Sequence, residues 1–71
     1  MTGTIRVLLN GAPHELSAAS AVTTALARLG CPDGAGLAVA RNGTVVPRAD
    51  WPRTPLADGD QVEVVTAVQG G

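Results

Sequence analysis

The chain has 71 residues, of which 45% are apolar, and a formal net charge of −1 at pH 7. A domain of this size buries only about 60% of its unfolded surface, which argues against a deep enzyme pocket of its own. All five positive charges are scattered arginines and the only aromatic ring is that of Trp51, which argues against nucleic-acid binding. A single cysteine cannot form an internal disulfide, an iron–sulfur site or a structural zinc site, so we expect no metal. The start has no signal region and no stretch is long enough to span a membrane, so we expect a cytoplasmic protein.

The first predicted element is a hairpin. Residues 4–9 alternate in polarity, which predicts a half-buried strand with one apolar face. Asn10-Gly11 follows at once and favours a type I′ turn, because both residues tolerate a positive φ. The return strand covers residues 12–16. Pro13 cannot donate a ladder hydrogen bond, so we expect this strand at the edge of a sheet.

A helix is predicted over residues 21–29. Its apolar stripe at helical spacing is formed by Val22, Ala25, Leu26 and Leu29. Ser20 is the predicted N-cap, and Gly30 stands where a left-handed residue would end the helix.

A second hairpin follows a loop. The short apolar run at residues 37–40 is typical of a central strand, and Asn42-Gly43 turns it into a strand over 44–46. Three prolines between residues 47 and 60 predict an irregular segment, with a turn at Asp58-Gly59.

The last strand begins near Gln61, with Val62 and Val64 facing the core. The whole order is therefore hairpin, helix, hairpin, loop and strand. A helix this short must bury its stripe, and one sheet face is the only surface large enough. We predict an α+β fold, with a mixed sheet of four to five strands and one helix packed across one face. This order is that of the β-grasp, or ubiquitin-like, fold, in which the first and last strands are central, parallel neighbours.

Within that fold the chain resembles ThiS, the sulfur carrier family of thiamine biosynthesis. The resemblance spans nearly the whole chain and is strongest in three segments that stand in the family's order: VVPRADW, DGDQVEV and a terminal Gly-Gly. The departures are minor. Glu63 and Val65 stand where relatives often carry bulkier apolar residues, and the helix is rich in alanine.

The resemblance implies that the α-carboxylate of Gly71 is the functional group and that the chain is a protein substrate, not an enzyme. A ThiF-like adenylating enzyme would condense this carboxylate with ATP. A sulfur donor such as a cysteine desulfurase persulfide would then leave a thiocarboxylate, which passes sulfur to a ThiG-like thiazole synthase. Residues 1–68 would form the β-grasp domain and 69–71 a flexible tail, with Gly70 small enough to thread a narrow channel in the partner. The chain would bind no cofactor, and ATP would be used by the partner.

Two other functions share these features. One is a carrier of the same fold for another product, such as molybdopterin, cysteine or a specialised metabolite. The other is a β-grasp regulatory or ligand-binding domain with an idle tail. A phosphopantetheine carrier is disfavoured, because no Asp-Ser-Leu heads a helix and the chain is mostly strand.

The remaining candidate residues have simpler interpretations. Cys31 lies in a Cys-Pro loop with no adjacent His or Lys, so we interpret it as a plain small residue. His14 has no acidic or serine partner at a telling spacing and is interpreted as a surface histidine. Asp58 and Asp60 flank a glycine, which is typical of turn chemistry more than of a cation site. Trp51 is expected to fill a satellite core beneath the irregular segment.

Residue alternation also predicts an exposed face of the sheet. If Val62 and Val64 point inward, Val65 points outward. We expect an apolar partner surface formed by Val65, Val46 and Leu8. Three arginines are expected to surround it and to steer acidic partner surfaces: Arg41, Arg48 and Arg53.

Overall fold

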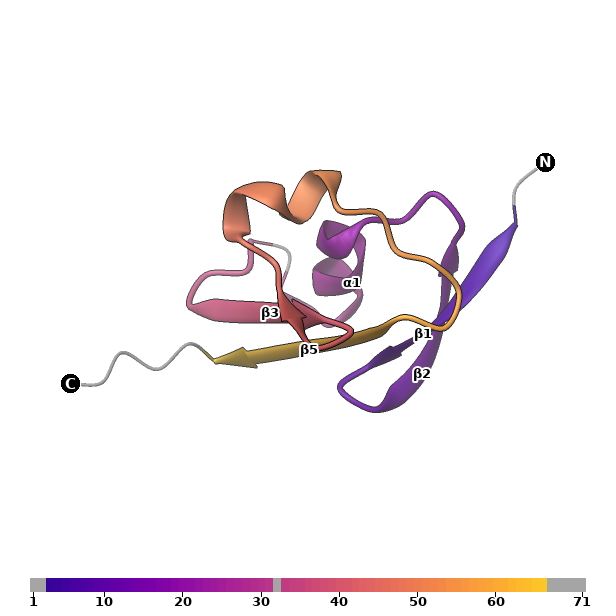
Figure 1. Cartoon of the computed structure of the whole chain (residues 1–71), viewed down its shortest axis with the longest axis horizontal. Coiled ribbons are helices and arrows are strands. Elements are labelled where there is room, and N and C mark those ends of the chain that lie inside the picture. The colour runs from indigo at the N-terminus through magenta and orange to yellow at the C-terminus, as the bar shows by residue number, and fades with distance from the viewer. Residues whose placement is uncertain (1–2, 32, 67–71) are drawn as a thin grey trace.

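The computed structural model describes residues 3–31 and 33–66. In this part of the chain a sheet packs against one α-helix, and a 3₁₀ helix precedes the last strand (Figure 1). The elements are β1 (Thr4–Leu9), β2 (Ala12–Ser17), α1 (Val22–Arg28), β3 (Leu37–Arg41), β4 (Thr44–Val45), η1 (Arg48–Arg53) and β5 (Gln61–Thr66). The predicted α+β fold is confirmed.

The sheet has five strands in the order β2-β1-β5-β3-β4. β1 and β5 are parallel neighbours, and the other three pairs are antiparallel. The predicted central pair of first and last strands is therefore correct. β2, which contains Pro13, lies at one edge as expected.

Both Asn-Gly turns form as predicted. Asn10 and Gly11 have φ values of 52° and 85°, and Asn42 and Gly43 have values of 52° and 84°. These left-handed conformations are those of a type I′ turn, whose twist matches that of the strands it joins. The register of both hairpins is thereby fixed at the turn.

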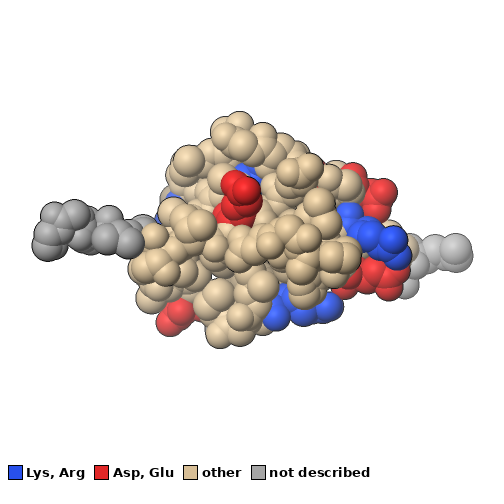
Figure 2. Space-filling view, turned by 90° about the horizontal axis from the view of Figure 1, so that it is seen from below, with Lys and Arg blue, Asp and Glu red and all other residues tan. Residues whose placement is uncertain are grey.

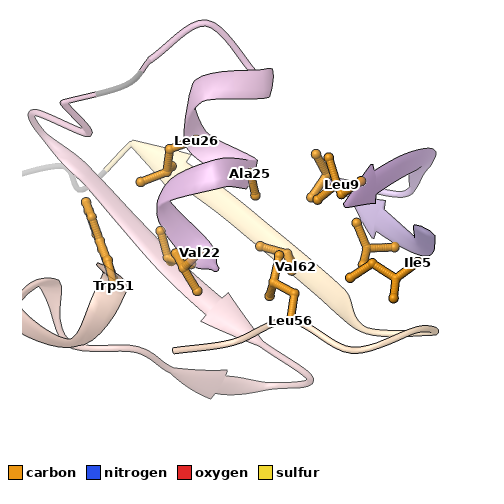
Figure 3. Close-up of a cluster of buried hydrophobic side chains, with 11 residues drawn as sticks. Ile5, Leu9, Val22, Ala25, Leu26, Trp51, Leu56 and Val62 are labelled. Atoms are coloured by element: carbon orange, nitrogen blue, oxygen red, sulfur yellow. The ribbon is translucent and has the colours of Figure 1, made fainter. Parts of the chain in front are cut away.

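The core lies between α1 and one face of the sheet. The predicted inward residues of β1 are all buried, as is Val62 of β5, and Val64 packs against the same cluster. Figure 3 shows Trp51 at one end of the cluster and Ile5 and Leu9 at the other. The buried hydrophobic residues are Ile5, Val7, Leu9, Leu16, Val22, Ala25, Leu26, Val39, Trp51, Leu56 and Val62.

The start of the helix differs from the prediction. The N-cap is Ala21, and Ser20 is buried with its hydroxyl unpaired among the described residues. Thr24 supplies half of a capping box, since its Oγ1 accepts a hydrogen bond from the Ala21 N–H at 3.1 Å. The end of the helix follows the prediction, because Gly30 has a φ of 85° and its N–H donates to the Ala27 carbonyl.

The segment predicted to be irregular contains a regular piece. Arg48–Arg53 form a 3₁₀ helix, which tolerates Pro52 because proline has a suitable fixed φ. Trp51 in this helix joins the main core and not a satellite one, being only 5% exposed. Its indole N–H donates to the Val46 carbonyl at 2.9 Å. The turn at Asp58-Gly59 forms as predicted. Neither helix that the structure describes is long and apolar enough to cross a membrane.

Candidate functional site

The predicted functional residues Gly70 and Gly71 lie outside the described residues, and so does the predicted boundary between domain and tail after residue 68. The strand that precedes them in the sequence, β5, is described up to Thr66. It lies in the centre of the sheet, between β1 and β3. The pairing with β1 covers only Gln61 and Val62, whereas the pairing with β3 continues to Thr66, so β5 ends beside β3 alone.

The asparagines of both hairpin turns bind the backbone of β5 or the residue before it. Asn10 Oδ1 accepts a hydrogen bond from the Val64 N–H at 2.8 Å, and its Nδ2 donates to the Val64 carbonyl at 3.2 Å. Asn42 Oδ1 accepts from the Gln61 N–H at 2.9 Å, and its Nδ2 donates to Asp60 Oδ1 at 3.0 Å. Glycine would suit these turns as well, but only a side-chain amide supplies both a donor and an acceptor at this distance. The two asparagines hold β5 from opposite sides.

Asp60 is the buried carboxylate at the start of β5, with 6% of its surface exposed. Its Oδ2 accepts from Arg41 Nε at 2.9 Å and from the Ala57 N–H at 2.8 Å. Burial raises the pKa of Asp60, but the hydrogen bonds from Arg41, Asn42 and the Ala57 N–H outweigh it, so the pKa lies below its usual value. The neighbouring Asp58 accepts from the Arg6 N–H at 2.8 Å. Both carboxylates thus stabilise the turn, as the turn interpretation predicted.

The outer face of the sheet, opposite α1, carries an apolar patch. Val65 is 57% exposed and lies directly across from Ala38. Val45 is 69% exposed and lies directly across from Ala40, which in turn is the neighbour of β5 on the same face. We call these four residues, Ala38, Ala40, Val45 and Val65, the outer-face patch. The patch includes Val65, the residue before the last described residue of β5.

Figure 2 views the molecule from this side. Uncharged side chains cover most of the face, an acidic group stands near its middle with part of a basic group visible beside it, and other charges gather at the margins. An apolar surface of this kind on a small domain is typical of a partner-binding site.

The expected patch is corrected at one residue, Val46. Val65 is exposed as predicted, but Val46 lies just after β4, donates its N–H to the Val39 carbonyl and packs against the core. Leu8 is half-buried and belongs to the outer face, across from Gln61 of β5 and therefore beside the patch.

The arginines expected around the patch contact other groups. Arg41 pairs with Asp60, and Arg53 lies 3.9 Å from Asp50. Arg48 stacks on the Trp51 ring at 5.0 Å and donates to the carbonyls of Asp33 and Gly34. They do not form the ring around the outer-face patch that the sequence suggested.

The ThiS family model matches residues 7–71, which is most of the chain and includes the two terminal glycines. The chain belongs to the ThiS family. The resemblance that VVPRADW, DGDQVEV and the diglycine indicated is thereby confirmed.

Two known proteins show where this ThiS-family chain stands among its relatives. The thiamine biosynthesis protein ThiS of Geobacter metallireducens has a similar structure, with a TM-score of 0.80 and 29% sequence identity. That similarity covers 94% of this chain and all of the other. A thiazole synthase of Paramagnetospirillum magneticum (strain ATCC 700264 / AMB-1) is 33% identical over 67 residues. These residues are 94% of this chain but 20% of that protein, so the chain spans about a fifth of the length of this relative.

The other two candidate residues, Cys31 and His14, lie in surroundings that fit a structural role. Cys31 is half-buried and packs against the core, and His14 is half-buried in edge strand β2. No group of three His, Cys, Asp or Glu side chains that could hold a metal ion occurs among the described residues, and no pocket is found there.

Sequence reasoning missed three residues of the outer-face patch, namely Ala38, Ala40 and Val45. A signal for them was present. A two-residue turn at Asn42-Gly43 forces Arg41 to face Thr44 and Ala40 to face Val45, which gives the register of the whole hairpin. Since Val39 and Val64 face the core, the alternate residues must face outward.

Proposed function

We propose that this chain is a sulfur carrier of thiamine biosynthesis whose C-terminal Gly71 carboxylate is converted to a thiocarboxylate. The observation that carries the proposal is the family match, which extends to Gly71 itself. The likeness to the thiamine biosynthesis protein ThiS of Geobacter metallireducens, over the whole of that chain, supports the same role. In this role the chain is a substrate of other enzymes and binds no cofactor.

The chemistry begins with the carboxylate. A free α-carboxyl group has a pKa of about 3.3–3.7, so it is an anion at neutral pH and can attack phosphorus. A ThiF-like adenylating enzyme would join it to the α-phosphorus of ATP, with release of pyrophosphate. The terminal sulfur of a persulfide, such as that of a cysteine desulfurase, would attack the carbonyl carbon and displace AMP. A thiol would then cleave the S–S bond of the acyl disulfide, leaving a thiocarboxylate on Gly71 and a disulfide on the donor.

The glycines suit this chemistry. Gly70 and Gly71 lack a Cβ, so the end of the chain can enter a narrow channel and take up backbone angles that other residues avoid. Gly71 is five residues beyond Thr66 in the sequence, and an extended chain spans at most about 3.3–3.6 Å a residue. A partner that holds the domain can therefore receive the carboxylate up to about 17 Å beyond Thr66.

A thiazole synthase is the proposed acceptor of the sulfur. In the protein of Paramagnetospirillum magneticum, a segment similar to this chain is part of a longer chain named thiazole synthase. Joining two domains in one chain raises the effective concentration of each domain near the other, which favours their reaction when they act in sequence. We infer that this ThiS-family chain binds a ThiG-like thiazole synthase and passes sulfur to it. We also infer that the ATP-dependent activation of Gly71 takes place in the cytoplasm.

Intact mass spectrometry tests the proposal. The chain is incubated with ATP, a ThiF-like enzyme of the same organism and a persulfide donor. A mass gain that matches replacement of one oxygen by sulfur, localised to the peptide that ends in Gly71, is the expected result. A chain without Gly70 and Gly71 is the control and gains no mass. An unchanged mass, with the enzyme active on another carrier, would contradict the proposal and favour a domain with an idle tail.

A further inference from the structure

Both hairpin turns contain the dipeptide Asn-Gly, as Asn10-Gly11 and Asn42-Gly43, and this dipeptide is open to a spontaneous reaction. The backbone nitrogen of the glycine attacks Cγ of the asparagine, because glycine has no Cβ to obstruct the approach. The Cγ–Nδ2 bond breaks, ammonia leaves with the proton of the glycine N–H, and a five-membered imide forms. Water then opens the imide to an aspartate or an isoaspartate. A neutral amide thereby becomes a carboxyl group that is ionised at neutral pH.

Both asparagines are exposed, but hydrogen bonds direct their amides toward β5 and the residue before it. The backbone N–H of Asn42 also donates to the Gln61 carbonyl at 2.7 Å, and that of Asn10 to the Val62 carbonyl at 2.9 Å. Closing the imide ring brings the amide carbon to the glycine nitrogen of its own turn, so the side-chain hydrogen bonds must break first. The fold therefore protects each asparagine for as long as its turn stays closed.

The two turns differ in one partner. Nδ2 of Asn10 donates to a neutral group, the Val64 carbonyl, in a hydrogen bond exposed to solvent. Nδ2 of Asn42 donates to a carboxylate, Asp60 Oδ1, at 3.0 Å in a partly buried position. A hydrogen bond to an ionised group is roughly twice as strong as one between neutral groups. The amide of Asn42 is therefore held more firmly than that of Asn10.

The reaction would reverse the contact between residue 42 and Asp60. A carboxylate at position 42 has no proton to donate, and it would face the carboxylate of Asp60, which is only 6% exposed. Like charges at this distance repel, and more strongly where burial reduces the screening by water. Arg41, which bonds Asp60 at 2.9 Å, would then face two carboxylates. At position 10 the new carboxylate would face only the neutral carbonyl of Val64.

We propose that Asn42-Gly43 is a site of spontaneous deamidation that the closed turn protects, and that the reaction there turns an attractive contact with Asp60 into a repulsive one. Asn10-Gly11 has the same sequence and the same turn but lacks a charged partner, so its modification is the milder one. A transient opening of the second hairpin is thereby made permanent by water alone. The modified chain is weakened at the start of β5, and this holds whether or not the chain is a sulfur carrier.

The first test compares the rates at the two sites in the unaltered full chain. The chain is incubated in mildly alkaline buffer with and without denaturing urea, and peptide mapping by mass spectrometry follows the replacement of NH₂ by OH at each asparagine. In urea we expect similar rates, because glycine follows both asparagines. In the folded chain both should react more slowly, and Asn42 about 10-fold more slowly than Asn10. If Asn42 reacted as fast as in urea, or as fast as Asn10, the proposed protection would be overturned.

The second test measures the repulsion by urea unfolding of Asn42→Asp and Asn10→Asp, each with and without Asp60→Asn. Asn42→Asp should raise the equilibrium constant for unfolding about 10-fold more than Asn10→Asp does. Asp60→Asn should destabilise the unaltered chain and Asn10→Asp, but should restore part of the stability of Asn42→Asp, because it removes one of two facing carboxylates. An equal effect of Asp60→Asn in all three backgrounds would overturn the proposed repulsion. The rate measurement needs no variant, so it decides the protection even if Asn42→Asp does not fold.

Discussion

The side chain of Asn10 takes the place of a strand beside the end of β5. In the parallel pairing of β1 with β5, Leu8 lies opposite Gln61 and Leu9 lies opposite Val62. β1 then ends at Leu9. At Val64 the Asn10 amide supplies both the acceptor and the donor that a neighbouring strand would have supplied. Replacing Asn10 by glycine keeps the turn, since glycine adopts the φ of 52° without strain, and removes both hydrogen bonds.

The size of the effect follows from these two bonds. A hydrogen bond contributes about 0.5–1.5 kcal/mol net, and both bonds are exposed to solvent, so we expect Asn10→Gly to cost about 1–2 kcal/mol. A 71-residue domain has an unfolding free energy of roughly 4–10 kcal/mol, so this loss is a measurable fraction. It corresponds to a fall in Tm of about 5–15 °C. Asn10→Asp keeps the acceptor for the Val64 N–H and loses the donor, so it should lie between the two.

Urea unfolding followed by the fluorescence of Trp51, the only tryptophan, gives the free energies. Amide hydrogen exchange gives the local effect, and the Val64 N–H should lose protection in Asn10→Gly before the rest of β5 does. If Asn10→Gly matched the unaltered chain in both measurements, the Asn10 amide would not be holding β5. Equal losses in Asn10→Asp and Asn10→Gly would show that the acceptor contributes nothing.

Three further predictions concern the core, the outer face and the buried carboxylate. In Gly34→Ala the new Cβ would overlap the Trp51 ring at a φ of 62°, costing about 2–5 kcal/mol, whereas Gly36→Ala, at a φ of 72° with open space, should cost about 1–2 kcal/mol in the same urea assay. Equal losses would refute the steric argument. Val65→Asp should weaken binding of the adenylating enzyme about 10-fold and change the unfolding free energy by less than about 0.5 kcal/mol, because Val65 is exposed; a large stability loss would place Val65 in the core. The pKa of Asp60 is lowered from 3.8, so its contribution is full above that value and is lost as the pH falls through the folded pKa. Asp60→Asn should therefore lower stability at pH 7 by about 1–3 kcal/mol and flatten the pH dependence below about pH 4, and an unchanged acid profile would contradict this assignment.

The sequence was sufficient for most of the fold because its signals are local. Polarity alternation over β1, the two Asn-Gly turns and the helical stripe each depend on a few neighbouring residues. Ser20 shows where such reasoning fails. Its carbonyl accepts from the Leu56 N–H, and the Val22 N–H donates to Thr54, so the residues before α1 are held by a segment far along the chain. That long-range contact buries Ser20 and moves the N-cap to Ala21, although a local pattern favours serine.

The candidate site divides in the same way. The alternation of residues in β5 was sufficient to predict that Val65 faces outward. The register of the second hairpin would also have shown that Val45, and not Val46, belongs to the outer-face patch. The dual use of Asn10 and Asn42 could not be predicted, because an Asn-Gly pair has a sufficient local reason in its turn. Only the placement of β5 between the two hairpins shows that each amide also has a partner 19 or more residues away.

The two asparagines explain why a fold with so small a core can present β5 in a fixed position. One neighbour, β1, is paired only at the start of β5, and the edge strand β4 is two residues long. Asn10 holds Val64 and Asn42 holds Gln61, so the start and the middle of the strand are each tied to a hairpin turn. A protein that docked on the outer-face patch would contact β5, the strand that leads in the sequence to Gly71. If the strand slid by one residue, its side chains would exchange faces and the patch would be lost together with the core contacts of Val62 and Val64. The same hydrogen bonds that hold the fold therefore also hold the strand that leads in the sequence to the carboxylate that we propose is activated.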